Sequence, residues 1–294
     1  MSFLNFTGIM NKLLPALLII FVLAGCKQKK RLITSPQHYS FKGVTPTKLD
    51  LALKEISGLA WDKEREEFLA HYDESGSLFV LDKGSLQIVP PSPYKFDKKG
   101  DYEDIALYNG TPYLLISNGT IVKVNRDSTG KVVNAEEVGE IGVTGTNDFE
   151  TMYADTARRA LVIVCKNCAS DDKGQVSAYA FYPDSIGFVN EPIYRMDAAK
   201  IKEMATKQGH HKTSKFQPSA ASIHPILKKL FIISSASSQL VIADLNGNPE
   251  QVYEFGEKLF PQPEGLTFKN DGTMYISNEG VTSKATILLF RYKP

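Results

Sequence analysis

Short apolar segments recur along the chain at intervals of about ten residues, and glycine, asparagine and aspartate separate them. The segments are rich in β-branched and aromatic residues, which favour strands. They include residues 68–70, 78–81, 113–116, 160–164 and 230–233. Short strands with this spacing are typical of an all-β sandwich, barrel or propeller.

One segment departs from this pattern and predicts a helix. Residues 197–204 follow a helical order of polar and apolar positions. Asp197 stands where an N-cap is expected, and Gly209 marks the stop.

A repeated motif decides among the three β architectures. Each copy has polar residues four and two positions before an apolar anchor, and the anchors are Leu59, Ile105, Met152, Ala221 and Leu266. The anchors lie 46, 47, 69 and 45 residues apart, and the longest interval contains the predicted helix. A period in the forties with several strands per unit is typical of propeller blades. We therefore predict a five-bladed β-propeller.

A five-bladed ring needs a strand that closes it. The last unit, residues 264–294, has room for only three strands, so we expect an N-terminal strand near Tyr39–Val44 to supply the fourth and to cover an open edge. The alternative is a six-bladed ring, which would need a further unit between Met152 and Ala221. Residues 181–194 are the candidate for that unit, and they lack the motif.

The polar positions before the anchors form two sets. The first set is Glu55, Asp101, Asp148, Gln217 and Gln262, and the second is Ser57, Glu103, Glu150, Ser219 and Glu264. Because side chains alternate between the two faces of a strand, both sets should point into the central channel or its mouth if each unit opens with its innermost strand. Six of the ten are carboxylates, which repel one another unless they are protonated, hydrated or neutralised.

A bound cation is one way to neutralise these carboxylates. Oxygen ligands without a nearby cluster of histidine or cysteine suit a hard ion, and Ca²⁺ takes about six to eight of them. We therefore predict a calcium site, whose ligands would be Glu55, Asp101, Glu103, Asp148, Glu150 and Glu264. The alternative is a solvated acidic channel in which Lys166 supplies the counter-charge.

Other polar residues are candidates for the rim of the channel. In a propeller the ends of the second strands share a face with the starts of the first strands, which adds residues from several units to the polar positions above. The predicted rim residues are Ser57, Asp73, Lys166, Gln217, Ser219, Gln262, Asn278 and Glu279.

The beginning of the chain predicts export. Residues 1–25 read as a signal peptide whose apolar run of 12 residues, 13–24, is too short to cross a bilayer core of about 30 Å. Leu23-Ala24-Gly25-Cys26 resembles a bacterial lipobox, so we expect lipidation of Cys26 and a tether over residues 26–38 that ends at the propeller domain, 39–294. The alternative is an uncleaved anchor with a chance cysteine. Lys27, in place of aspartate, favours the outer membrane of the cell envelope.

Composition and cysteine usage narrow the function further. The chain has 294 residues, of which 43% are hydrophobic and 23% charged, as in ordinary globular proteins. Lys+Arg 34 against Asp+Glu 33 gives a net charge of +1, so no basic excess points to nucleic acid. Cys165 and Cys168 have CxxC spacing at a strand end, where we expect a local disulfide in preference to redox catalysis. A zinc site would need a second pair of ligands.

The five motifs together resemble a known family. They read EISGLAWD from Glu55, DYEDIALY from Asp101, DFETMYAD from Asp148, FQPSAASIHP from Phe216 and PQPEGLTF from Pro261. In this order they are similar to the SdiA-regulated (YjiK-like) family of bacterial propellers. The resemblance implies a five-bladed propeller distantly similar to NHL-repeat proteins, with a calcium site and no established activity. Gln217 and Ser219 depart from the acidic pattern, so that side of the ring is expected to be neutral.

Two functions remain open. The first is a non-catalytic, calcium-binding lipoprotein, a monomer that binds a small ligand or a protein partner through its acidic mouth. The second, by analogy with related propellers, is a metal-dependent hydrolase such as an esterase, lactonase or phytase-like enzyme, in which a ring carboxylate would act as the base. The sequence offers no histidine beside the ring, which favours binding, and it assigns no catalytic residue.

Overall fold

The computed structural model of the protein describes residues 1, 34–96, 100–185, 187–210 and 214–294. The chain forms two units, Met1–Leu32 and Ile33–Pro294, and the second unit holds all of the helices and strands given below. The predicted signal peptide after Met1, the lipidation site Cys26 and residues 26–33 of the predicted tether lie outside the described residues. No helix in the described part of the chain is long and apolar enough to span a membrane.

Five antiparallel sheets of four strands each make up the second unit. In four of them the chain completes one sheet before it starts the next. Their strands are β2 (Ile56–Asp62), β3 (Glu67–Tyr72), β4 (Ser77–Leu81) and β5 (Tyr94–Lys95); β6 (Tyr102–Tyr108), β7 (Thr111–Ile116), β8 (Thr120–Arg126) and β9 (Val132–Glu140); β10 (Asn147–Asp155), β11 (Ala160–Cys168), β12 (Gln175–Tyr182) and β13 (Gly187–Asp197); and β14 (Ala220–Ile223), β15 (Leu230–Ser234), β16 (Gln239–Ala243) and β17 (Pro249–Glu254).

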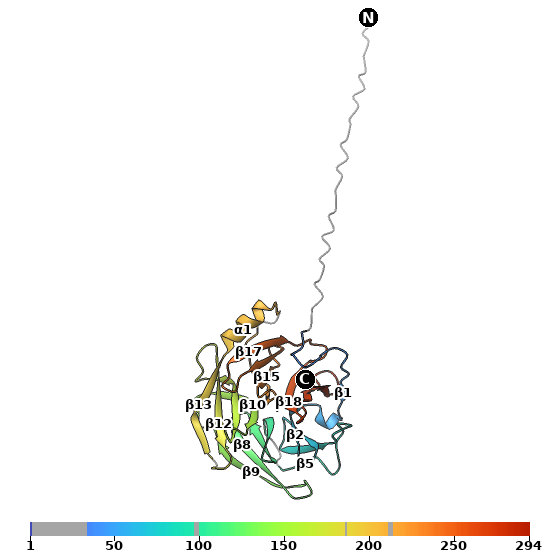
Figure 1. Ribbon diagram of the computed structural model, residues 1–294, viewed down its shortest axis with the longest axis vertical. Helices are drawn as coiled ribbons and strands as arrows, with labels where there is room; N and C mark the ends of the chain where they lie inside the picture. Colours follow the sequence, from blue (N-terminus) through green and yellow to red (C-terminus); the bar gives the residue numbers. More distant parts are fainter. Residues whose placement is uncertain (2–33, 97–99, 186, 211–213) are drawn as a thin grey trace. The chain divides into compact units, whose positions relative to one another are not determined.

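The fifth sheet joins the two ends of the unit. Its strands are β18 (Pro263–Phe268), β19 (Met274–Asn278), β20 (Thr286–Phe290) and β1 (Thr47–Lys48). The first strands of the sheets contact one another in a closed circle, β2 to β6, β10, β14, β18 and back to β2, while strands such as β9 and β13 lie at the outside (Figure 1). This arrangement is a five-bladed β-propeller closed by an N-terminal strand, as the sequence predicted.

The closing strand lies further along the chain than predicted. β1 pairs Thr47 with Ile287 and Lys48 with Thr286, whereas residues 39–44 form no strand. Their aromatic side chains are instead buried between the fourth and fifth blades. Burying large aromatic rings between sheets stabilises the fold more than placing them along an edge strand. The short polar segment that follows them therefore closes the ring.

The region between Met152 and Ala221 adds no sixth blade. Residues 181–182 end β12 and residues 187–194 belong to β13, both in the third blade, so the six-bladed alternative is wrong. The third blade then leads into the helix that the sequence predicted.

The predicted helix is confirmed as α1 (Ala198–Lys207), and a short 3-10 helix, η1 (Leu51–Leu53), precedes β2. The carboxylate of Asp197 accepts a hydrogen bond of 2.8 Å from the backbone N–H of Lys200, which caps the first turn. Gly209 has a φ of 75° just after the helix ends, a conformation that glycine adopts without strain.

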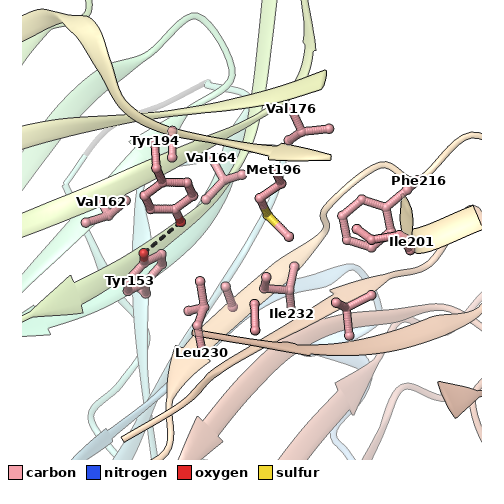
Figure 2. Packing of buried hydrophobic residues seen from close by; sticks show 14 of the residues in the cluster. Tyr153, Val162, Val164, Val176, Tyr194, Met196, Ile201, Phe216, Leu230 and Ile232 are labelled. Carbon is pink, nitrogen blue, oxygen red and sulfur yellow. Dashed lines mark hydrogen bonds between the residues drawn. The ribbon is translucent and has the colours of Figure 1, made fainter. Parts of the chain in front are cut away.

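The hydrophobic core lies between neighbouring blades, and each of its five clusters draws on two of them. Figure 2 shows the cluster between the third and fourth blades, where the hydroxyls of Tyr153 and Tyr194 are 2.8 Å apart and Ile201 of α1 packs beside Phe216. All five clusters are made of residues from the second unit. Since this unit also closes its own ring, it has the contacts that a domain needs to fold by itself.

A buried histidine fixes the segment that precedes β1. The Nδ1 atom of His224 accepts hydrogen bonds of 3.1 Å from the backbone N–H groups of Ile226 and Leu227. Its Nε2–H therefore donates to the hydroxyl of Tyr39 at 2.6 Å, and that hydroxyl donates to the carbonyl of Gly272 at 2.6 Å. Burial lowers the pKa of His224 to about 4, which keeps the ring neutral in this chain of hydrogen bonds.

We predict that replacing His224 by leucine lowers the free energy of unfolding by about 1–3 kcal/mol at neutral pH, and that the difference from the wild type narrows in acid. The unfolded histidine binds a proton below about pH 6.5 while the folded one stays neutral until about pH 4, so the wild type loses stability over this window as pH falls. Denaturant unfolding of residues 33–294 measures both values. A difference that stays constant with pH would contradict the assignment.

Candidate functional site

The inner strands of the blades begin around a polar cavity of about 380 Å³, called the central cavity below. It is lined by Ser57, Asp73, Asp101, Glu103, Glu150, Lys166, Gln217, Ser219, Ser235, Ala236, Gln262, Glu264 and Glu279. Six of these residues are carboxylates and one is a lysine, so the charged groups around the cavity carry an excess of negative charge. A smaller cavity of about 130 Å³ lies along the inner strands and is lined by all five anchor residues.

Three predicted site residues do not line the central cavity. Glu55 precedes β2, and its half-exposed carboxylate lies 3.8 Å from the Lys54 ammonium. Asp148 lies in β10 beside the cavity, with its carboxylate 3.7 Å from the Lys166 ammonium. Asn278 is fully buried. The other predicted ligands and rim residues all line the cavity.

Asn278 points away from the cavity because of its place in β19. It is the last residue of that strand, and Glu279 follows it. Successive residues of a strand face opposite sides, so only Glu279 reaches the cavity. The amide of Asn278 instead donates a hydrogen bond of 3.2 Å to the hydroxyl of Thr286 on β20.

Ser235 and Ala236 line the cavity although the sequence did not single them out. Ser235 directly follows β15, as Asp73 follows β3 and Glu279 follows β19. The residue after the second strand therefore occupies the same place in three blades. The position directly after the second strand is therefore the sequence signal that locates Ser235 in the fourth blade.

β-Bulges aim four of the inner polar residues at the cavity. In β6, Tyr102 pairs with Ile116 and Asp104 with Leu115, which leaves Glu103 between them without a partner. The same irregularity surrounds Ser57, Glu150 and Glu264 in their own blades. A bulge redirects the extra side chain and increases the local twist. These four side chains are therefore positioned by bulges. The first-set residues Glu55, Asp101, Gln217 and Gln262 precede the strands. Regular alternation of side chains along a strand therefore explains the position of neither set.

The third blade has a second bulge, which places the single lysine of the cavity. Asp148 pairs with Asn167 and Phe149 with Cys165, so Lys166 is the unpaired residue of β11. Its ammonium contacts the carboxylate of Glu150. A disulfide joins Cys165 to Cys168 across this bulge, and a covalent link at this position restrains the turn that directs Lys166 into the cavity.

One histidine packs against an inner strand without lining the central cavity. His71 on β3 is buried against Gly58, where a Cβ atom would lie only 2.4 Å from its Nε2. Burial lowers the pKa of His71 to about 4. His71 is not among the described residues that line the central cavity, so it supports the bulge of β2 from behind.

Three polar side chains form hydrogen bonds between neighbouring inner strands, and Ser219 is the one of these three that was predicted from the sequence as a site residue. The carboxylate of Asp104 accepts hydrogen bonds from its neighbour Ile105 at 2.7 Å and from Met152 of the next blade at 2.8 Å. The hydroxyl of Ser219 donates to the carbonyl of Pro263 at 2.9 Å, and Thr267 accepts from the backbone of β2 at 3.1 Å. These bonds hold the strands that position the cavity residues.

The cavity changes the acidity of its carboxyl groups. Burial raises the pKa of Glu103 to about 8, and the charges of Asp101 and Asp148 contribute to the rise. Burial likewise raises the pKa of Glu264 to about 7, with a contribution from Glu279. Without a further cation, each of these two carboxyl groups is therefore partly protonated near neutral pH.

The first and fifth blades bring a second pair of acids together. Burial raises the pKa of Asp73, and the negative charges of Glu55 and Glu74 raise it further. Burial also raises the pKa of Glu279, followed by the charges of Asp73 and Glu55. The side-chain amide of Gln262 donates a hydrogen bond to Glu279, so a neutral group contacts this carboxylate.

The spacing of the acids limits how a metal ion could be held. Among the described histidine, cysteine, aspartate and glutamate residues, one group brings three ligand atoms within 4.8 Å of one another, and it consists of Cys165, Cys168 and Asp171. Two of these are the sulfurs of the disulfide. No such group occurs among the described carboxylates of the central cavity, so a single ion bound by all six predicted ligands does not match the side-chain positions.

Comparison with known proteins identifies the family. The model of the family described as SdiA-regulated matches residues 34–281, well over half of the chain. The protein belongs to the SdiA-regulated family. No curated protein matches this SdiA-regulated chain at a significant level.

Solved structures share the fold of this SdiA-regulated protein at low sequence identity. Myxococcus xanthus glutaminyl cyclase has a TM-score of 0.53 at 12% identity, with 82% of this chain and 92% of that chain covered. A glucose dehydrogenase has a TM-score of 0.53 at 10% identity, with 85% and 100% covered. The PQQ-bound aldose sugar dehydrogenase of Streptomyces coelicolor has a TM-score of 0.50 at 12% identity, with 88% and 100% covered. At these identities the similarity concerns the fold alone.

We predict that the double variant Glu103→Gln/Glu264→Gln melts at a higher temperature than the wild type in EDTA at about pH 8.5. The folded wild type holds protons on these two groups that unfolded glutamates release above about pH 4.5, so its stability falls as pH rises from about 4.5 to about 8. Glutamine removes this dependence, and about 1 kcal/mol shifts the Tm by about 2–4 °C in a domain of this size.

Thermal unfolding of residues 33–294 across this pH range tests the prediction. Glu191→Gln, at an exposed position of the outer strand β13, is the matched control and should follow the wild type. A double variant whose Tm falls in parallel with the wild type would show that these carboxyl groups titrate normally.

Proposed function

We propose that this SdiA-regulated protein is a binding propeller of the bacterial cell envelope, anchored by lipid on Cys26, whose central cavity binds a cation, with Ca²⁺ as the best match. The observation that carries the proposal is the imbalance of charge in the cavity, where six carboxylates share the lining with one lysine. Like charges that line one partly buried cavity repel one another. A cation relieves that repulsion.

The single lysine leaves most of the negative charge uncompensated. Lys166 contacts Glu150 and lies near Asp148, both on its own blade. The pKa of Glu264, from the fifth blade, remains raised to about 7 by burial even though the charge of Lys166 opposes the rise. A second positive charge would therefore favour the ionised form of acids that Lys166 does not neutralise.

The donor set suits a hard ion held partly by water. Because no three described carboxylates of the cavity approach within 4.8 Å, two carboxylates at most would contact one ion without side-chain movement. The remaining ligands would come from Gln217, Ser219 and Gln262, which line the cavity, and from water. Ca²⁺ accepts such mixed oxygen ligands, about six to eight in number.

The anchor is proposed from the sequence. Leu23-Ala24-Gly25-Cys26 resembles a lipobox, and Lys27 in place of aspartate favours the outer membrane. Full-length protein should fractionate with membranes, and Cys26→Ser should release it or leave the signal peptide attached. A Cys26→Ser protein of unchanged size and membrane association would exclude the lipid anchor.

A metal-dependent hydrolase is a second candidate for the same cavity. Glu103 and Glu264 have pKa values raised to about 8 and about 7, the range in which a carboxylate accepts a proton most effectively near neutral pH. A bound ion with water ligands would supply an acidified water. Calcium-dependent turnover of an ester, a lactone or a phosphate would support this candidate over a binding module.

We predict that Ca²⁺ raises the Tm of residues 33–294 in a concentration-dependent way, because an ion that binds only the folded state stabilises it. Glu103→Gln/Glu264→Gln should weaken the affinity by about tenfold or more. Lys166→Met, which removes the competing positive charge, should strengthen it. Calorimetric titration and thermal unfolding after removal of metal measure both effects.

The control is again Glu191→Gln, which should bind Ca²⁺ as the wild type does. A Tm that does not change between EDTA and excess Ca²⁺ would overturn the calcium site. Equal binding by the wild type and the double variant would place the ion elsewhere in the molecule.

A further inference from the structure

A second and larger cavity, of about 660 Å³, lies between α1 and the loop that joins β11 to β12. We infer that this cleft, called the α1 cleft below, is a binding site for a small organic anion with an apolar body, such as a medium-chain carboxylate. Its volume is in the range of small-molecule sites. The inference is independent of the calcium proposal, since it concerns different residues.

The α1 cleft and the central cavity lie on either side of the same chain segments, and no described residue lines both. Lys166 lines the central cavity, while its neighbours Asn167 and Cys168 line the cleft. In the same way Gln217 lines the central cavity and Phe216 lines the cleft. Two short segments of chain therefore separate two cavities that can be occupied and tested separately.

The floor of the α1 cleft is apolar. Ile201, Ala205 and Phe216 are buried in the core cluster between the third and fourth blades, and all three line the cleft. Figure 2 shows Ile201 and Phe216 side by side in that cluster. Ala198 and Ala199, at the start of α1, also line the cleft. Their small side chains leave the space above the floor open. An alkyl chain or an aromatic ring in this space would be removed from water against the floor.

The edges of the α1 cleft carry lysines from three separate segments. Lys173 belongs to the loop, Lys202 to α1 and Lys215 to the segment before β14. The ammonium of Lys215 donates a hydrogen bond of 2.8 Å to the side chain of Asn167, which holds it at the edge. An acid group at this edge would find several ammonium donors within one site.

The acids of the α1 cleft offset these lysines only in part. Asp171 accepts a hydrogen bond of 3.2 Å from the backbone of Ser177 with one carboxylate oxygen, and its other oxygen is shielded from solvent. Asp171 itself lines the cleft, so its negative charge offsets part of the positive charge of the lysines. Asp172 remains as the exposed acid among three lysines. The charge of the cleft is thus opposite in sign to that of the central cavity.

The apolar floor and the lysines together determine the ligand class. An inorganic anion would fill little of a cavity of about 660 Å³, and an uncharged apolar molecule would offer the lysines no negative charge. A carboxylate on an alkyl or aromatic body satisfies both parts of the site. The probe is decanoate, and decanol is the comparison because it has an alkyl chain of the same length and no charge.

Calorimetric titration of decanoate into residues 33–294 tests the inference. We expect saturable binding at one site. Lys202→Gln/Lys215→Gln should weaken it by about tenfold, and Ala199→Trp, which fills the cleft from an exposed position of α1, should abolish it. Lys200→Gln is the matched control, because this lysine lies on the same helix but does not line the cleft. Decanol should bind more weakly than decanoate.

Three results with the free ligands would overturn the inference. They are no saturable binding of decanoate by the wild type, binding that Ala199→Trp leaves unchanged in a variant with wild-type Tm, and equal affinity for decanol. Lysine-dependent binding to phosphatidylglycerol vesicles without binding of free decanoate would also overturn it, since the site would then recognise a membrane surface. Failure of the calcium proposal would leave all of these measurements unaffected.

Discussion

Five inner strands must begin around one axis, and this requirement brings acidic residues from four blades into one small space. The ring closes because each inner strand contacts the next and β18 contacts β2. Hydrogen bonds that Asp104 and Thr267 accept and that Ser219 donates hold adjacent inner strands at fixed positions. The backbone segments that carry these carboxylates therefore cannot move apart without opening the ring. Protons, hydration, Lys166 or a bound cation can each relieve the repulsion between the carboxylates.

The same requirement explains why the fold could be predicted from the sequence. Each blade presents an apolar anchor to the centre, so Leu59, Ile105, Met152, Ala221 and Leu266 repeat with a period that reflects the blade itself. The helix was equally predictable, because the cap by Asp197 depends on residues close in sequence. The closing strand depends on contacts between distant segments. Because Tyr39 and Phe41 are buried in the core, Thr47–Lys48 forms this strand in place of the predicted residues.

The orientation of the site residues was less accessible from the sequence. Strand alternation predicted that Glu103 and Glu264 would face the centre, yet bulges are what aim them there. A bulge is an irregularity of pairing with a neighbouring strand, and the bulge at Glu103 has no adjacent glycine to mark it in the sequence. For the same reason the sequence did not predict that His71 lies against Gly58, because this contact depends on how β2 and β3 pair.

The propeller thus carries two cavities of opposite charge on either side of the segment that contains the disulfide. Binding of a cation in the acidic cavity is tested most directly by an anomalous difference map from crystals of residues 33–294 grown with Ca²⁺. We predict a peak in the central cavity within bonding distance of oxygens from Glu103 or Glu264. A map without a peak there, at a Ca²⁺ concentration that saturates any change in Tm, would contradict it.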